Sequence, residues 1–180
     1  MKIVLSRKAL RSVTSGNRTH SIHASDREKL LEHLFVGDLL RCLWRRGKTG
    51  IEVLRSEVDG SGYDLLLELD GILRHVQLKS SFRGAKTIDV KINSALARKP
   101  SGCVVWVFFE QSTVDLGPFL WLGGEPGKPL PALGDRIAKH TKGDRTGKKA
   151  ARPNIRLVRK TAFEPMDTID DVARALFGLQ

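Results

Sequence analysis

The chain has 180 residues, 41% of them hydrophobic, which is enough for one folded domain and excludes a wholly disordered protein. Its 31 Lys and Arg against 20 Asp and Glu give a net charge of +11, which favours a polyanionic partner such as nucleic acid. Two cysteines exclude a disulfide scaffold and a cysteine-rich zinc site, and the longest apolar run, residues 103–109, is too short to span a membrane. The start MKIVLSRKAL lacks the apolar stretch of a signal peptide, so we expect a cytoplasmic protein without a membrane segment.

The whole sequence divides into an N-terminal arm and one domain. Residues 1–24 are rich in basic and hydroxyl side chains with little periodicity, and we expect them to form a basic N-terminal arm. A single α/β domain is expected over residues 25–180. It begins with a helix, because Ser25 and Glu28 fit a capping box and apolar residues then recur at helical spacing until Gly47.

The rest of the domain alternates strand and helix signals. The seven apolar residues 103–109 suit a strand that is buried on both faces. Short helices are expected over residues 93–99, 133–140 and 168–177. Further strands are expected over residues 51–54, 63–69, 72–79, 87–92, 119–122 and 154–158. Together these elements predict an α/β fold in which a mixed central β-sheet is flanked by helices.

Two of the predicted strands form a hairpin. Asp70 and Gly71 between them are the strongest signal for a two-residue turn. With that turn Asp64 lies opposite Gln77, and the alternation of side chains places both on one face together with Lys79. The other face is apolar except for Arg74. The sequence therefore predicts a polar cluster on one face of an otherwise apolar hairpin.

The first predicted helix adds a carboxylate to this cluster. Glu32 heads a stripe of apolar residues spaced four, seven and eleven positions along the helix, so its side chain points toward the protein body. A charge there needs a partner or a metal ion, because an unpaired buried charge is costly. The carboxylates of Glu32 and Asp64 and the amide oxygen of Gln77 are hard ligands that suit magnesium. Lys79 can hold or deprotonate a water beside such an ion.

The segments GYDLLLEL and HVQLKSS resemble the core motif of the PD-(D/E)XK nuclease superfamily, which has the restriction-endonuclease-like fold. In that motif an Asp opens a β-hairpin, an acidic residue and a Lys two positions later lie on the next strand, and a preceding helix carries a Glu. Asp64, Lys79 and Glu32 match the motif Asp, the motif Lys and the helix Glu. Gln77 stands where Asp or Glu is usual. The resemblance covers residues 25–107 and, through Gln77, implies a Gln-x-Lys variant of the motif.

The resemblance implies a nuclease that uses Mg²⁺ or Mn²⁺ to cleave phosphodiester bonds in DNA. Its metal ligands would be Asp64, the side-chain oxygen of Gln77 and the backbone carbonyl of Leu78. Lys79 would position the attacking water, and Glu32 would act as an outer ligand through a water. Because many nucleases of this fold are homodimers, the resemblance is also compatible with a homodimer.

The excess positive charge is concentrated in residues 139–160, which we expect to form a loop. This segment holds nine Lys and Arg against one Asp, a net charge of +8. Such a segment neutralises the phosphates of a nucleic-acid backbone, and its Thr side chains can hydrogen-bond to them. The predicted nucleic-acid-binding residues are Lys139, Lys142, Arg145, Lys148, Lys149, Arg152 and Arg156.

Three functions are open at this point. The leading hypothesis is a magnesium-dependent endonuclease that acts on DNA. The alternative is a catalytically inactive nucleic-acid-binding module with the same fold, for which the neutral Gln77 is the argument. A third hypothesis is a small basic protein that binds structured RNA or a protein complex. Divalent-metal binding distinguishes the first hypothesis from the other two.

Overall fold

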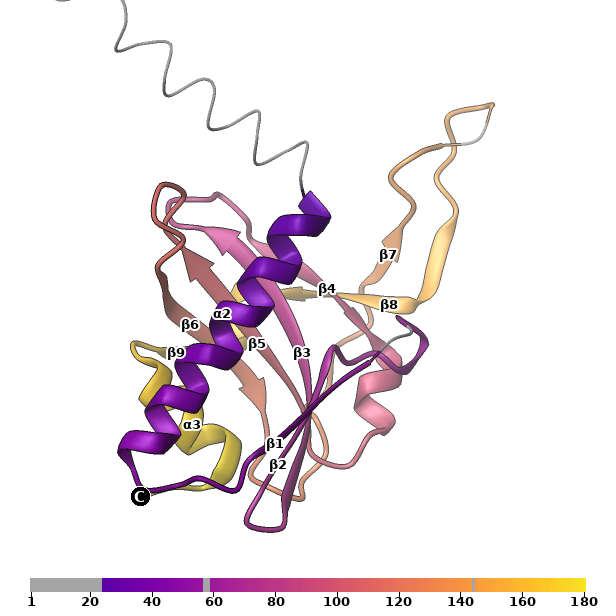
Figure 1. Cartoon of the computed structure of the whole chain (residues 1–180). Coiled ribbons are helices and arrows are strands. Elements are labelled where there is room, and N and C mark those ends of the chain that lie inside the picture. The colour runs from indigo at the N-terminus through magenta and orange to yellow at the C-terminus, as the bar shows by residue number, and fades with distance from the viewer. Residues whose placement is uncertain (1–23, 57–58, 144) are drawn as a thin grey trace, which may run out of the picture.

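The computed structural model describes residues 24–56, 59–143 and 145–180. The predicted arm over residues 1–24 therefore lies, apart from Ala24, outside the described residues. The described chain forms three layers: two helices, a six-stranded mixed sheet, and a three-stranded sheet on the other side. Figure 1 shows α2 crossing the front of the larger sheet. The predicted α/β class with a mixed central sheet is confirmed.

The elements are labelled as in Figure 1, and their bounds are as follows. The helices are α2 (Ala24–Arg45) and α3 (Ile169–Phe177), and the 3₁₀ helices are Asp59–Ser61, Ser94–Arg98 and Lys160–Ala162. The larger sheet has the order β1-β2-β3-β5-β6-β9, with β1 (Glu52–Arg55), β2 (Leu65–Leu69), β3 (Ile72–Phe82), β5 (Gly102–Phe109), β6 (Leu116–Gly123) and β9 (Glu164–Met166). The smaller sheet has the order β4-β8-β7, with β4 (Asp89–Asn93), β8 (Ala151–Arg159) and β7 (Ile137–Lys139). Only β3 and β5 pair in parallel in the described larger sheet, which makes it mixed.

Strand β5 joins the layers because it is buried on both faces, as its unbroken apolar sequence predicts. One face contributes to a core shared with α2 and α3, and the other contributes to a core shared with the smaller sheet. The first set is Cys103, Val105 and Val107, and the second is Val104, Trp106 and Phe108. The larger sheet is therefore covered on both sides where β5 lies.

The predicted hairpin forms with the predicted register. Leu66 pairs with His75, and Asp70 and Gly71 make the two-residue turn with φ of 51° and 81°. Positive φ at both positions belongs to the turn type that best fits the twist of the flanking strands. The apolar face packs into the core shared with the helices, and Arg74 is buried there with no exposed surface.

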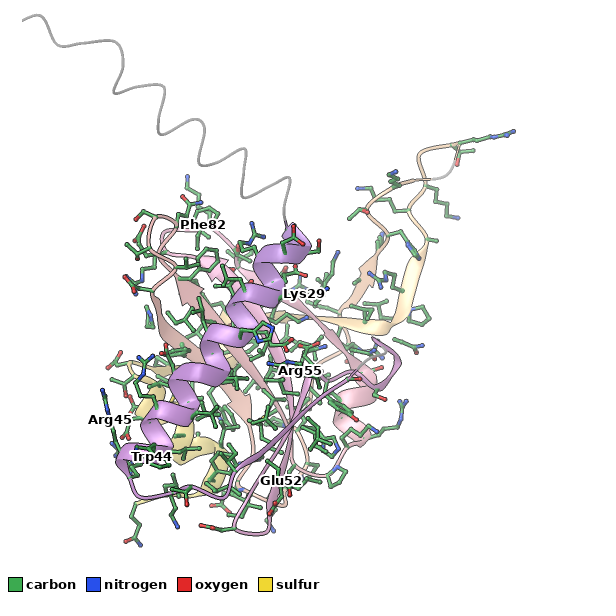
Figure 2. All side chains as sticks on the ribbon, in the orientation of Figure 1. Lys29, Trp44, Arg45, Glu52, Arg55 and Phe82 are labelled. Atoms are coloured by element: carbon green, nitrogen blue, oxygen red, sulfur yellow. The ribbon has the colours of Figure 1, made fainter. Side chains whose placement is uncertain are left out.

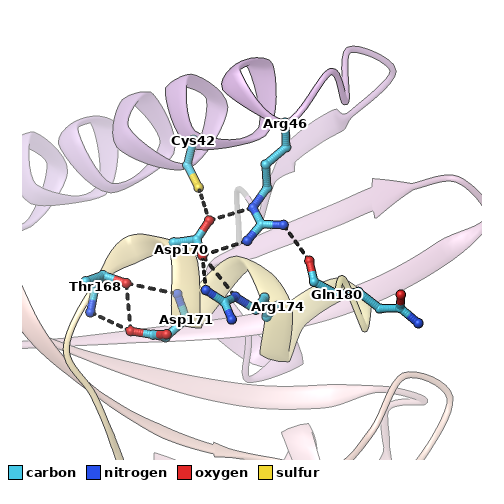
Figure 3. A network of polar contacts seen from close by, with 7 residues as sticks. All are labelled: Cys42, Arg46, Thr168, Asp170, Asp171, Arg174 and Gln180. Carbon is cyan, nitrogen blue, oxygen red and sulfur yellow. Dashed lines mark hydrogen bonds and ion pairs between the residues drawn. The ribbon is translucent and has the colours of Figure 1, made fainter.

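The two helices are joined through a polar network at their ends, drawn in Figure 3. The carboxylate of Asp170, at the start of α3, accepts hydrogen bonds from Cys42 and Arg46 at the end of α2 and from Arg174 one turn along α3. Thr168 caps α3 reciprocally with Asp171. Neither described helix is long and apolar enough to cross a membrane.

Three local predictions are wrong. Ser25 does not cap the first helix, because α2 already includes Ala24 and Ser25. Residues 133–140 do not form a helix. Their last part is strand β7, in which Ala138 is buried between two exposed neighbours and pairs with β8. The basic segment 139–160 is not simply a loop, because Ala151–Arg159 is strand β8 and only the residues before it connect β7 to β8.

Candidate functional site

Strands β2 and β3 separate next to Asp64, and we call this point the β2–β3 fork. The pairing of β2 with β3 begins at Leu65 and Val76, whereas β3 continues to Phe82. The backbone N–H of Asp64 donates to the Val76 carbonyl at 2.9 Å, and its Oδ2 accepts from the Leu78 N–H at 2.6 Å. The Asp64 carboxylate therefore accepts the hydrogen bond from β3 that the carbonyl of a neighbouring strand would otherwise accept, and this bond fixes the carboxylate at the fork.

One cavity lies on the face of the fork that is turned toward the smaller sheet, and we call it the fork cavity. Asp64, Gln77 and Lys79 all line it, as the hairpin register predicts. Gln77 is only 7% exposed, and its Oε1 has no hydrogen-bond partner in the described residues. Because a buried amide oxygen without a partner is costly, this atom is suited to receive a donor or a cation that enters the cavity.

A second cavity, the helix cavity, lies between the fork and α2. Asp64 and Lys79 line it as well as the fork cavity, so these two side chains are shared by both. Glu32 lines the helix cavity from α2. Its Oε1 accepts a hydrogen bond from Arg55 Nε at 2.6 Å, so the partner that the sequence required for this carboxylate is an arginine of β1. Figure 2 shows Arg55 beside α2, next to the part of the helix that carries Lys29.

The smaller sheet closes the fork cavity with residues that the hairpin pattern does not contain. Lys91 of β4 and Arg152 of β8 line it together with Asp64, Gln77 and Lys79. Arg152 was predicted to bind nucleic acid, whereas Lys91 was not singled out. The described lining holds three basic side chains, Lys79, Lys91 and Arg152, against the single acidic side chain of Asp64. Such a balance favours a phosphate group as the occupant.

The other predicted basic residues lie away from these cavities. Arg156 donates to the Pro153 carbonyl within β8. The remaining five line neither cavity and are exposed on the β7–β8 hairpin or its connection: Lys139, Lys142, Arg145, Lys148 and Lys149. The structure thus places Arg152 at the fork and the rest of the basic segment beyond it.

A buried histidine supports the wall of the fork cavity. The ring of His75 contacts the ring of Tyr63 edge-on, with centroids 4.9 Å apart, and Tyr63 lines the cavity. Nδ1 of His75 lies 2.8 Å from the Pro100 carbonyl. Burial lowers the pKa of His75, which keeps the imidazole neutral at pH 7. His75 therefore positions Tyr63 and contributes no charge to the cavity.

The oxygen atoms at the fork fit a hard divalent cation. They are the Asp64 carboxylate, Gln77 Oε1 and the Leu78 carbonyl, which points to the same edge of β3 as the Leu78 N–H that Asp64 accepts. No group of three or more His, Cys, Asp or Glu side chains in the described ranges could hold a metal. A site made of one carboxylate, one amide oxygen and one backbone carbonyl would supply few protein ligands, which suits Mg²⁺ because this ion keeps several of its waters.

Comparison with known proteins gives one structural similarity. No protein-family model matches the chain, and no curated protein matches it. Among solved structures, the chain is similar to the bacterial homing endonuclease I-Ssp6803I, with 26% sequence identity and a TM-score of 0.26. The match covers 49% of this chain and 56% of the endonuclease, so this chain spans little more than half the length of that protein.

Proposed function

We propose that the chain is a metal-dependent nuclease with the restriction-endonuclease-like fold that cleaves phosphodiester bonds in DNA. The observation that carries this proposal is the meeting of Asp64, Gln77 and Lys79 in one cavity at the β2–β3 fork. Asp64 directly precedes β2, and Gln77 and Lys79 lie on β3, so the hairpin register brings the three side chains together. Asp64 and Lys79 also line the helix cavity with Glu32.

The residues at the fork would have three roles, which are metal binding, orientation of the attacking water and phosphate binding. Asp64, Gln77 and the Leu78 carbonyl would hold Mg²⁺ or Mn²⁺, which supplies neutralisation of phosphate charge and a more acidic bound water. Lys79, two positions after Gln77 on β3, lines both cavities, and its ammonium group would orient the attacking water or hold a phosphate oxygen. Lys91 and Arg152 would hold the phosphate from the smaller sheet through charge-assisted hydrogen bonds.

Glu32 has a weaker role in this scheme than the other acidic residue. Its carboxylate is already paired with Arg55, whereas the Asp64 carboxylate is fixed at the fork by a backbone N–H. We therefore assign Glu32 the positioning of a water between α2 and the fork. Replacing Glu32 by Gln should lower activity less than replacing Asp64 by Asn.

Cleavage of plasmid DNA by the purified chain tests the proposal. Cleavage should require Mg²⁺ or Mn²⁺ and stop in EDTA, and Asp64→Asn and Lys79→Ala should each lower the rate by about 100-fold or more. Glu52→Gln is the matched control, because it removes an exposed carboxylate from β1 outside both cavities. Cleavage that persists in EDTA or in Asp64→Asn would contradict the proposal.

The basic lining of the fork cavity supports a second candidate, a catalytically inactive module that binds nucleic acid. Gln77 brings no charge, and three basic side chains outnumber the one acidic side chain there. Such a module binds DNA equally well with Mg²⁺ and with EDTA and leaves plasmid DNA intact. The same assay, with binding measured beside cleavage, separates the two candidates.

A further inference from the structure

The β7–β8 hairpin is a short two-stranded ribbon that ends in a longer connection between residues 139 and 151. Ala138 pairs with Arg152 and Lys139 with Ala151, and the chain between these pairs connects the two strands. All described residues from 139 to 154 are exposed. In Figure 1 the hairpin projects from the body of the molecule at the upper right, away from α2 and α3. Both hydrophobic cores exclude this part of the hairpin.

The chemistry of the hairpin is that of a surface for nucleic acid. Residues 139–152 include six Lys and Arg and one Asp. Between the basic residues are neutral side chains that can form hydrogen bonds to base edges, namely His140, Thr141 and Thr146. The positive charges neutralise phosphates irrespective of sequence, whereas such neutral groups can distinguish bases.

The base of the hairpin is part of the candidate site. Arg152 and Ile155 of β8 line the fork cavity with Asp64, Gln77 and Lys79. A nucleic acid whose backbone enters this cavity therefore lies alongside the hairpin. Three residues lie between Ile155 and Ala151, the first residue of β8, a span of about 13 Å at the rise of a β-strand. Because base pairs are stacked about 3.4 Å apart, the connection that precedes Ala151 begins about four base pairs from the part of the cavity that Ile155 lines.

We propose that the β7–β8 hairpin enters the major groove of B-form duplex DNA beside the bond that is cleaved. This inference rests on the proposed function and names its substrate. The major groove of B-DNA is about 12 Å wide and admits a two-stranded β-ribbon, whereas the minor groove, at about 6 Å, is too narrow. The major groove of duplex RNA is deep and narrow and excludes such a ribbon. A projecting protein hairpin with basic side chains on both of its strands therefore selects duplex DNA over duplex RNA.

Binding of the full chain to defined nucleic acids tests this inference, with Ca²⁺ in place of Mg²⁺ to prevent cleavage. The probes are a pool of 30-base-pair DNA duplexes with randomised centres, the corresponding RNA duplexes, and the single strands. We expect the DNA duplexes to bind at least about tenfold more tightly than either alternative. Glucosylated hydroxymethylcytosine, which fills the major groove, should weaken binding by about tenfold, whereas netropsin, a minor-groove ligand, should not.

A variant that shortens the β7–β8 hairpin tests whether this hairpin is the part of the chain that contacts the major groove. Replacing residues 141–149 by Asn-Gly keeps His140 opposite Ala150 and Lys139 opposite Ala151. It should remove the sensitivity to glucosylation while the melting temperature stays near that of the parent, because the replaced residues lie outside both cores. Equal binding to RNA duplexes, tighter binding to single strands, no binding to any probe, or sensitivity to netropsin alone would overturn the inference. Metal-dependent cleavage that ignores glucosylation would overturn this inference alone. Groove-sensitive binding without any cleavage would overturn only the proposed nuclease.

Discussion

Gln77 determines how a cation can be held at the β2–β3 fork. In the proposed metal site it would be a neutral ligand beside Asp64, at a position where a second carboxylate would double the negative charge. Its Oε1 is buried and has no hydrogen-bond partner in the described chain, so a cation that reaches it would offset the cost of its burial. A cation bound by one carboxylate and one amide is attracted less strongly than a cation between two carboxylates. We therefore expect weak binding of divalent ions to the unmodified chain.

Gln77→Glu tests this expectation. The substitution keeps the side-chain length and the ligand oxygen and adds one negative charge close to Asp64. Without metal the two carboxylates repel each other, and a bound cation relieves the repulsion. We expect Mn²⁺ to bind about tenfold more tightly, which is the size of effect that one added charge has a few ångströms from a partly solvated ion. Isothermal titration calorimetry measures the change directly.

Two further variants complete this measurement. Gln111→Glu makes the same substitution after β5, outside both cavities, and should leave Mn²⁺ affinity unchanged. Asp64→Ala should abolish binding. If Gln77→Glu binds Mn²⁺ no better than Gln111→Glu does, Gln77 is not a ligand and the assignment of the metal site fails.

Arg74 shows how a single residue can depart from the pattern of its strand. The apolar face of the hairpin contains it as an exception, and periodicity alone does not say how its charge is accommodated. In the structure its guanidinium donates to the backbone carbonyls of Leu176 and Ala175 at the end of α3 and to that of Gly124 after β6. These acceptors lie about 50 and 100 positions away along the chain. The burial of Arg74 therefore depends on tertiary contacts that a local pattern does not contain.

At the scale of elements, the contact between α2 and α3 depends on Asp170. Arg46 and then Arg174 hold the pKa of the Asp170 carboxyl well below its usual range by donating hydrogen bonds to it. A carboxyl whose pKa is lowered on folding stabilises the folded state above its unfolded pKa, near 3.9, and this contribution is lost as pH falls through the folded value. The network of Figure 3 is thus expected to be strongest at neutral pH.

Asp170→Asn provides the test at this scale. The variant keeps the shape of the side chain but loses its charge, so it should melt at a lower temperature than the parent at pH 7. The difference in melting temperature should shrink progressively as pH falls below about 4, because the carboxyl is then protonated in the unfolded state while the folded state still holds it charged, and it should vanish only near the lowered folded pKa. Asp38→Asn is a suitable control, because Asp38 forms an exposed pair with Arg41 on α2 alone. A pH-independent difference for Asp170→Asn would show that packing, rather than charge, joins the helices here.

The elements that could be predicted from the sequence are those with local causes. The two-residue turn fixed the register of β2 and β3, and with it the shared cavity of Asp64, Gln77 and Lys79. The helix predicted over residues 168–177 is α3, which ends before Gly178 in the left-handed conformation, and the apolar run 103–109 forms β5, which is buried on both faces. Each of these signals lies within a dozen residues of the element it specifies.

The elements that could not be predicted depend on distant partners. Strand β7 has only three residues and becomes a strand because β8 pairs with it. Lys91 reaches the fork cavity because the smaller sheet packs on the far face of β5, through contacts between segments that are well separated in sequence. The alternation of residues 87–92 predicts a strand but does not indicate which cavity its side chains line.

At the scale of the whole molecule, positive charge is concentrated on one projecting hairpin. Lys148 and Lys149 lie in its exposed connection. Replacing both by Ala should reduce the slope of log affinity for duplex DNA against log salt concentration by about two units, since each phosphate contact contributes about 0.9. Fluorescence anisotropy over a range of NaCl concentrations measures this slope.

The matched control removes the same charge from another surface. Arg41→Ala with Arg45→Ala takes two positive charges from α2, and Figure 2 shows Arg45 at the end of that helix far from the hairpin. This variant should keep the parental slope. Equal slopes for the parent and for the Lys148→Ala, Lys149→Ala variant would show that the hairpin increases solubility without contacting phosphates.

The exclusion of residues 139–151 from both cores bears on how this protein can evolve. Substitutions there remove no buried apolar contact, so the fold tolerates them, while the oxygen and nitrogen atoms at the fork stay where the larger sheet places them. A lineage can therefore change the ribbon that meets the ligand without disturbing the chemistry beside it. If the hairpin contacts the target as proposed, the positions that tolerate substitution are also the positions that recognise the target, and single substitutions there can change specificity while the protein stays folded.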